Sequence, residues 1–257
     1  MIPKVIHYCW FGHNPKPELV QKCINSWKKY CPDYEIIEWN EENFDVSSNV
    51  YAKEAYQAKK WAFVTDYARL WIIYNYGGIY LDTDVELIKS LDSLLELPAF
   101  LGFEDEKNIA TGLGFGAVKK NKLVDCMLKD YENICFINKD GTYDKLPCPI
   151  RNTNAIASFL PQRIIPGTVI SIEDGNIYPA EYFCPLSADG KSMKKTKNTY
   201  SIHWYSASWL SKDEMVVHKW RLFKNKCERY FGITIGGYIA RCVYLFKPRE
   251  RAILKKL

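Results

Sequence analysis

Two carboxylates separated by one residue, in Asp82-Thr83-Asp84, have the spacing most suggestive of chemistry in this chain. They follow an apolar run at residues 79–81, which predicts a short strand. Because side chains alternate along an extended chain, both carboxylates are expected to face one spot. Mg²⁺ and Mn²⁺ prefer such oxygen ligands and can bridge to phosphate oxygens. The pair therefore predicts a divalent cation site, although acidic turns after strands are also common where no cation binds.

The elements that position these carboxylates are predicted from hydrophobic patterns and turn residues. A strand over 4–11, a helix over 18–30 and a strand over 34–39 give the opening of a parallel sheet. Ligands of such sheets bind at the carboxyl ends of the strands. A long helical pattern over 52–76, interrupted near Lys60, is ended by Gly77-Gly78 directly before the strand that carries the acidic pair.

The later part of the chain gives shorter elements. Strands are predicted over 100–103, 112–118 and 200–204, helices over 122–132 and 154–160, and turns with short strands over 161–185. No repeat or linker divides the chain. We predict an α/β fold with a mostly parallel central sheet. A catalytic domain would span 1–210, and a basic, aromatic, helical extension would span 211–257.

Three segments of this sequence resemble the glycosyltransferases of family 32. They are Ile6-His7-Tyr8-Cys9-Trp10-Phe11-Gly12, Asp66 to Arg69 and Gly77 to Asp84, and the glucosylating toxins are more distantly similar. Late in the chain, His203 to Trp209 looks like the histidine and Ser-Trp segment of these enzymes. The resemblance implies a single GT-A-type, Rossmann-like domain and a UDP- or GDP-sugar donor. It also implies Mn²⁺ or Mg²⁺ and transfer with retention of configuration.

The resemblance assigns cation-binding and diphosphate-binding roles to matching residues. Asp82 would contact the ribose and the cation, Asp84 would be the main cation ligand, and His203 would supply a ligand from the far side. A neutral imidazole suits Mn²⁺, although a single histidine is more often structural. Ser206 and Trp209 would donate hydrogen bonds to the diphosphate, since a hydroxyl and an indole N–H are apt donors.

Asp66 and Arg69 are three residues apart on a predicted helix and so share a face. They could form an ordinary ion pair, which contributes about 0.5 kcal/mol. In the functional interpretation Asp66 accepts hydrogen bonds from sugar hydroxyls and Arg69 contacts sugar or phosphate through its forked donors. We favour this interpretation because the helix leads directly into the D-x-D strand.

Four further residues are weaker donor-binding candidates. Trp10, at the end of the first strand, would stack on the nucleobase or belong to the core, and Asn40 would contact the base edge from the second strand. Asn152 and Asn154 could place an amide near the anomeric carbon. The sequence departs there from the Thr-Gly-Pro stretch expected in the family.

The composition is that of a globular chain with a formal net charge of +5, and nine cysteines form no C-x-x-C pair. We expect reduced thiols and, since no signal pattern opens the chain, a cytoplasmic protein. From Lys212 onward basic residues mix with aromatic ones, which suits either peripheral contact with the cytosolic face of a membrane or a solvated helix. No nucleic-acid reader module is recognisable.

The prediction from sequence is a retaining, metal-dependent hexosyltransferase or N-acetylhexosaminyltransferase. Its acceptor would be a saccharide, free or attached to a lipid, in the synthesis of a bacterial capsule, O-antigen or other surface polysaccharide. Two alternatives stay open: a metal-dependent phosphohydrolase or nucleotidyltransferase, which could also use two carboxylates, and a non-enzymatic sugar-binding protein.

Overall fold

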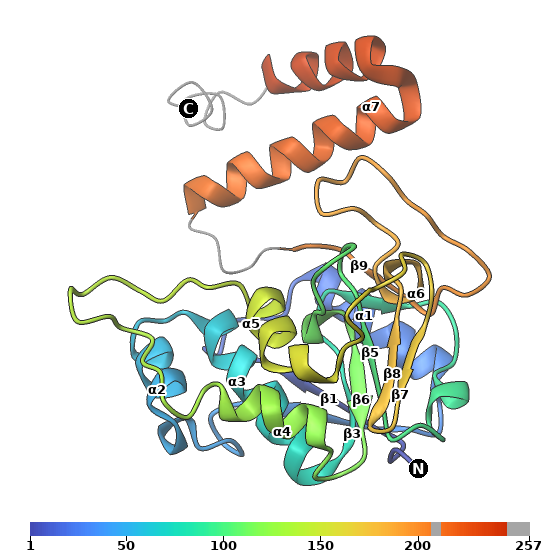
Figure 1. Cartoon of the computed structure of the whole chain (residues 1–257). Helices are drawn as coiled ribbons and strands as arrows, with labels where there is room; N and C mark the ends of the chain where they lie inside the picture. Colours follow the sequence, from blue (N-terminus) through green and yellow to red (C-terminus); the bar gives the residue numbers. More distant parts are fainter. Residues whose placement is uncertain (207–211, 246–257) are drawn as a thin grey trace. The chain divides into compact units, whose positions relative to one another are not determined.

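The computed structural model describes residues 1–206 and 212–245 (Figure 1). The chain forms two compact units. The larger one comprises Met1–Cys184 and Thr196–Trp204, and the smaller one comprises Pro185–Lys195 and the chain from Tyr205 onward. The predicted domain boundary after residue 210 stays a prediction.

The larger unit is built around a seven-stranded sheet with the order β2-β1-β3-β6-β5-β8-β7. Its strands are β1 (Val5–Cys9), β2 (Glu35–Trp39), β3 (Gly78–Tyr80), β5 (Ala99–Gly102), β6 (Phe115–Ala117), β7 (Ile170–Ile172) and β8 (Gly175–Tyr178). β6 and β7 run antiparallel to their neighbours, and the other five strands share one direction. The predicted α/β class with a mostly parallel sheet is confirmed.

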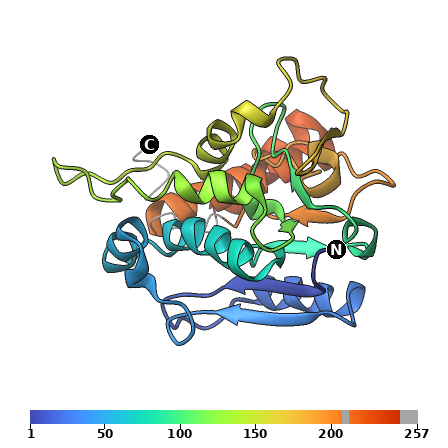
Figure 2. The ribbon, with the colours of Figure 1, turned by 60° about the horizontal axis from the view of Figure 1, so that its bottom comes forward.

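Two helices cover opposite faces of the amino-terminal strands. Tyr8 of β1 packs against Trp27 of α1 (Glu18–Tyr30), with ring centroids 5.5 Å apart. On β2, Trp39 lies in register with Cys9 and packs against Trp71 of α3 (Trp61–Tyr76). Because neighbouring side chains of a strand point to opposite faces, α1 and α3 lie on opposite sides of the sheet. Figure 2 shows α3, in cyan, beside the blue strands.

The helix that leads to the acidic pair is interrupted and ended as the sequence predicts. α2 (Val50–Gln57) stops before Lys59, whose φ of 56° cannot continue a helix, and α3 begins at Trp61. α3 ends at Gly77, with φ of 70°, where a Cβ atom would lie 2.9 Å from the backbone nitrogen of Lys119. A residue with a side chain would therefore not fit between α3 and β3.

The remaining helices of the larger unit are α4 (Lys122–Lys129), α5 (Cys148–Ala155) and α6 (Ala180–Phe183). Short 3₁₀ turns are η1 (Val46–Ser48), η2 (Asp92–Leu94), η3 (Thr111–Leu113) and η4 (Ala157–Phe159). The prediction of a helix over 154–160 was wrong, since α5 begins at Cys148 and only one 3₁₀ turn follows it. Pro149 lies in the first turn of α5, where proline costs no helical hydrogen bond.

The smaller unit contains α7 (Lys212–Leu245), in which two helical limbs meet at Gly232 with φ of 78° and ψ of 161°. The predicted helical character of the carboxyl-terminal segment is therefore confirmed for its described residues. Within this unit Arg229 Nη1 donates to the carbonyl oxygen of Gly190 at 3.3 Å, and Asn225 donates to that of Asp189. Among the described helices, none is both long and apolar enough to span a bilayer.

Candidate active site

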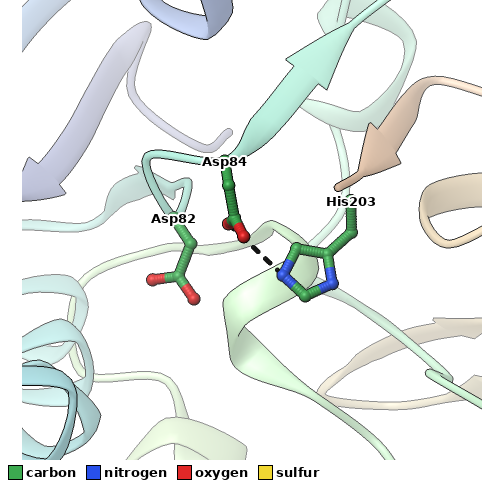
Figure 3. Close-up of side chains that lie close together, drawn as sticks. All are labelled: Asp82, Asp84 and His203. Atoms are coloured by element: carbon green, nitrogen blue, oxygen red, sulfur yellow. Dashed lines mark ion pairs between the residues drawn. The ribbon is translucent and has the colours of Figure 1, made fainter. Parts of the chain in front are cut away.

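The carboxylates of Asp82 and Asp84 converge with the imidazole of His203 (Figure 3), and ligand atoms of the three lie within 4.8 Å of one another. Asp84 directly precedes β4 (Val85–Leu87), which pairs with β9 (Ser201–His203) so that Val85 lies opposite His203. This register brings His203 Nε2 to 3.3 Å from Asp84 Oδ1. A residue from late in the chain thus completes a site begun by two neighbouring acids.

A turn, rather than strand alternation, brings the two carboxylates together. β3 ends at Tyr80, and the backbone N–H of Val85 donates to the carbonyl oxygen of Asp82 at 3.0 Å. A turn that contains Thr83 and Asp84 therefore separates β3 from β4. The expectation that both acids share one face is met, but its assumed cause, an extended backbone, is wrong.

The donor set formed by Asp82, Asp84 and His203 fits a hard divalent cation. Two carboxylates offer oxygen ligands and the imidazole offers nitrogen, which Mn²⁺ accepts readily and Mg²⁺ accepts less often. In residues 1–206 and 212–245 this is the only group of three or more acidic, histidine or cysteine side chains so arranged. The three residues are therefore the part of the described chain that could hold Mn²⁺ or Mg²⁺.

The Arg69 side chain pairs with two carboxylates, Asp66 of α3 and Asp82 next to the turn. Its Nη2 lies 3.1 Å from Asp66 Oδ1 and 3.2 Å from Asp82 Oδ1. Its Nε donates to the backbone oxygen of Thr65 at 3.1 Å, and its guanidinium lies over the Tyr80 ring, 5.2 Å from the centroid. The Tyr80 hydroxyl donates to Asp82 Oδ1 at 3.0 Å. The guanidinium is thereby fixed by its own helix, by two carboxylates and by an aromatic face.

Burial controls the ionisation of these groups. It raises the pKa of Asp66 to about 6, although the nearby Arg69 charge acts in the opposite direction. Burial likewise raises the pKa of Asp82 against the effect of Arg69. For His203, burial alone would lower the pKa, but the facing Asp84 carboxylate raises it well above its usual value. The site therefore holds its negative charge only through close positive partners.

Gly112 of η3 belongs to the site and was not predicted. A Cβ atom at this position would overlap Asp82 Oδ2 and lie 3.3 Å from Arg69 Nη1. The backbone of η3 therefore approaches the carboxylate more closely than any other residue type would allow. In the sequence, the run Thr111-Gly112-Leu113-Gly114 carried the signal of a close approach or turn, but it was interpreted as part of a strand.

A polar cluster from α5 and η3 contacts Arg69 through Cys148. Cys148 Sγ is 3.8 Å from Arg69 Nη1, 3.2 Å from Asn152 Nδ2 and 3.5 Å from Thr111 Oγ1, and Asn152 Nδ2 also donates to Thr111 Oγ1 at 3.0 Å. Burial raises the pKa of Cys148 to about 12, so its thiol stays protonated near neutral pH. Asn152 is fully buried, while Asn154 is exposed. Of the two asparagines only Asn152 lies near the charged pair.

Trp10 directly follows β1 and Asn40 directly follows the neighbouring strand β2, at the carboxyl edge of the sheet. The backbone N–H of Trp10 donates to the oxygen of Trp39 at 2.8 Å. The Trp10 indole donates to the Asn14 oxygen at 2.7 Å, and Asn40 Oδ1 accepts the Glu42 N–H at 2.9 Å. Both side chains thus have local partners, and their contacts with a nucleobase stay a prediction.

Of the two residues predicted in the Ser-Trp segment, one is described by the structure and one is not. Ser206 belongs to the smaller unit, and Trp209 lies outside the described residues. Their hydrogen bonds to a diphosphate stay predictions. Trp204, the last residue of the larger unit, instead donates from its indole to Glu86 Oε2 at 2.9 Å.

Residues 17–101 match the profile of a family described as the glycosyltransferase sugar-binding region containing a DXD motif. This segment is therefore similar to the sugar-binding regions of glycosyltransferases. It contains Asp66, Arg69, Asp82 and Asp84, whereas His203, Gly112 and the α5 cluster lie beyond it. The resemblance drawn from the sequence is confirmed.

Curated relatives are similar over part of the chain. Inositol phosphoceramide mannosyltransferase 1 of Schizosaccharomyces pombe is 32% identical over 111 residues, which are 39% of this chain and 33% of the relative. Mannosyl phosphorylinositol ceramide synthase CSH1 of Saccharomyces cerevisiae is 34% identical over 115 residues, 39% of this chain and 28% of the relative. The match thus spans about a third of the length of these relatives.

Among solved structures, the PaToxG glycosyltransferase superposes with a TM-score of 0.49 at 18% sequence identity. The superposition covers 61% of this chain and 69% of that one.

Proposed function

We propose that this protein transfers a sugar from a nucleotide-sugar donor, UDP- or GDP-linked, with Mn²⁺ or Mg²⁺ held by Asp82, Asp84 and His203. One observation carries the proposal. The group of candidate cation ligands, Asp82, Asp84 and His203, adjoins the buried Arg69, because Arg69 pairs with both Asp82 and Asp66. All but His203 lie in the matched sugar-binding region. A cation bound there would compensate the charge of the departing diphosphate.

The chain's own residues would orient the donor sugar. Asp66 accepts hydrogen bonds from sugar hydroxyls while Arg69 holds its carboxylate in place. The second guanidinium contact fixes Asp82, so a single side chain sets the distance between the sugar end and the phosphate end of the site. Such preorganised charges stabilise a transition state without reorganising during the reaction.

We propose transfer with retention, as the family resemblance implies, by a course that needs no nucleophile from the protein. Asp66 is the carboxylate at the sugar end, and its oxygen is paired with Arg69 at 3.1 Å. The acceptor hydroxyl would then attack on the face that the diphosphate leaves, and the departing phosphate would take its proton. The anomeric configuration of the product tests this step directly.

The acceptor in this proposal is a saccharide attached to a lipid at a membrane surface. The names of the relatives place their activity on a ceramide-based lipid, and the carboxyl-terminal segment of this chain is basic and aromatic. Synthesis of a bacterial surface polysaccharide would be one process with such an acceptor. The cytoplasmic location and the peripheral membrane contact belong to the same proposal.

The alternatives are less well supported by the site. A phosphohydrolase or nucleotidyltransferase with two cations would need a second group of ligands, and within the described residues Asp82, Asp84 and His203 form the only such group. A sugar-binding protein without activity would bind saccharide without needing a nucleotide. Nucleotide dependence therefore separates the two classes.

The test is Asp84→Asn, which preserves shape and removes charge from the cation site. Release of nucleoside diphosphate from a panel of nucleotide sugars with Mn²⁺ is expected to fall by about 1000-fold, because an amide is a weak ligand. Thermal unfolding measured with nucleoside diphosphate should show a Mn²⁺-dependent rise in midpoint for the natural chain alone.

Asp125→Asn is the matched control, because Asp125 pairs with Lys129 on α4 away from the site. It should keep the activity of the natural chain. Undiminished activity of the Asp84→Asn variant, or no nucleotide binding by the natural chain under any cation, would contradict the proposal.

A further inference from the structure

The carboxyl-terminal helix α7 is a helical hairpin. Its two limbs, residues 212–231 and 233–245, are joined at Gly232, whose φ of 78° reverses the chain (Figure 1). Gly236 lies directly against the backbone at Cys227 and Glu228, where a Cβ atom would overlap. The limbs are therefore in close contact next to the turn, and the turn forms a defined end, the hairpin tip, comprising residues 230–238.

The hairpin tip carries large apolar side chains that face solvent. Tyr230, Phe231, Ile233, Ile235 and Tyr238 expose 67, 56, 81, 61 and 71% of their surface. Within residues 1–206 the large apolar side chains that are more than half exposed are distant from one another in the sequence: Met1, Val50, Tyr76 and Ile165. The tip therefore gathers exposed apolar surface of the kind that marks an interaction site.

Basic residues accompany this apolar tip. The segment 215–245 contains six lysines and arginines and one acid, Glu228. Lys219, Arg221 and Lys226 are exposed on the first limb, whereas Lys224 Nζ is 3.6 Å from Glu228 and so partly neutralised. Exposed positive charge thus lies along the first limb that leads to the apolar tip.

We propose that the hairpin tip inserts into the interface of an anionic lipid bilayer. An apolar end with aromatic residues at its base enters the boundary between headgroups and acyl chains, and the surrounding lysines and arginines pair with anionic headgroups. A second copy of the chain would bring two sets of basic side chains together, which opposes that occupant. A fluid surface also accepts the end of a helical hairpin without a matching pocket.

This inference deepens the membrane-surface acceptor of the proposed function and supplies a docking element for it. Insertion at the tip accounts for binding without any helix that spans the bilayer. Two contributions to membrane binding are then separate: apolar contact at residues 230–238 and electrostatic attraction along the first limb. The two contributions respond differently to salt, because screening weakens only the second.

The test is co-sedimentation of the whole chain with vesicles of phosphatidylcholine, with and without about one third phosphatidylserine. The natural chain should sediment with the anionic vesicles at low salt. The double variant Phe231→Ser, Ile233→Ser should bind at least about tenfold more weakly and keep its salt dependence. Lys219→Glu with Lys226→Glu should also weaken binding, and should flatten the salt dependence.

Val50→Ser with Ile165→Ser is the matched control, because both side chains are more than half exposed on the larger unit. It should bind vesicles within about twofold of the natural chain. Equal binding by the tip variant and the natural chain would overturn the proposal, as would a natural chain that stays in the supernatant. A dimer in solution that the tip variant abolishes would assign the tip to a second copy instead.

The two proposals can fail separately. Release of nucleoside diphosphate from the donor into water is measured without vesicles, and the tip variant should show the rate of the natural chain. Vesicle binding without donor turnover would leave the tip as a membrane element and reject the transferase. Donor turnover without vesicle binding would support the transferase and reject the membrane role of the tip.

Discussion

Two buried arginines of this protein have almost the same surroundings and different uses. Arg69 on α3 and Arg151 on α5 expose 4 and 6% of their surface, and each pairs with two aspartates. Arg151 lies 3.0 Å from Asp130 and 2.5 Å from Asp144, with its guanidinium 5.2 Å from the centroid of the Tyr131 ring. A buried, doubly paired arginine is therefore not in itself a sign of an active site.

The difference lies in the carboxylates. The partners of Arg151 belong to the end of α4 and to a loop, and the side chains of Asp130 and Asp144 are 42 and 22% exposed. The partners of Arg69 are 13 and 26% exposed, and Asp82 also belongs to the group of candidate cation ligands. Arg151 joins surface segments to the core, whereas in the proposed function Arg69 sets the spacing of the charges that would face the donor. The comparison teaches that the role of a buried arginine depends on the other contacts that its carboxylate partners make.

The largest expected effect separates the two arginines directly. Arg69→Lys should lower kcat/KM for the donor by about 1000-fold, about 4 kcal/mol, because one ammonium cannot hold Asp66 and Asp82 in the geometry of a guanidinium. Arg151→Lys should change kcat/KM by less than about threefold and lower only the thermal midpoint. Steady-state kinetics and thermal unfolding of both variants provide the measurement. Comparable kinetic losses would remove the distinction between the arginines.

A third buried ionisable residue, His7, should affect stability rather than activity. Its Nδ1 accepts the Trp39 indole N–H at 3.0 Å and its Nε2 lies 3.1 Å from the Gly77 oxygen, an arrangement that suits the neutral ring. Burial lowers the pKa of His7 from 6.5 to about 4. Below pH 6.5 the unfolded chain binds a proton that the folded chain does not, so the free energy of unfolding should fall as pH falls towards 4.

The expected loss from this histidine is about 3 kcal/mol over that range. Urea unfolding of the natural chain and of His7→Gln at several pH values measures it. The variant should lose stability less steeply with falling pH, by about one proton. Parallel curves for the two chains would show that other groups cause the acid sensitivity.

The smallest effect concerns the glycine that approaches Asp82. Gly112→Ala should lower kcat/KM by about tenfold, because the added methyl must displace the Asp82 carboxylate or the η3 backbone. Gly237→Ala is the control, since the nearest atom to its Cβ would be Glu228 Oε1 at 3.6 Å, an ordinary contact. Retained activity in both variants would mean that η3 yields easily and does not fix Asp82.

Local patterns were sufficient for the parts of the fold and site that are local in the chain. The bounds of α1 follow from Pro17 before it and Cys31-Pro32 after it. Asp66 and Arg69 share a helix face by spacing alone, and Gly77-Gly78 ends α3 where the sequence indicates. In each case the residues that determine the structure lie within a few positions of one another.

Long-range packing explains what the sequence did not reveal. Cys148 of α5 contacts both Arg69 of α3 and Thr111 of η3, and no spacing in the chain encodes these contacts. The start of α5 at Cys148 was also missed, although Pro149 is compatible with a first helical turn. The turn at Thr83 was likewise hidden by a short apolar run that resembled a longer strand.

The pairing of β4 with β9 has a consequence for the time at which the site becomes complete. Asp82 and Asp84 leave the ribosome early, but their imidazole partner follows only after most of the larger unit has been synthesised. At ordinary elongation rates that delay is on the order of ten seconds. During it a growing chain presents two acids without their histidine. The register of one short strand pair thus makes full cation binding a property of the finished fold alone.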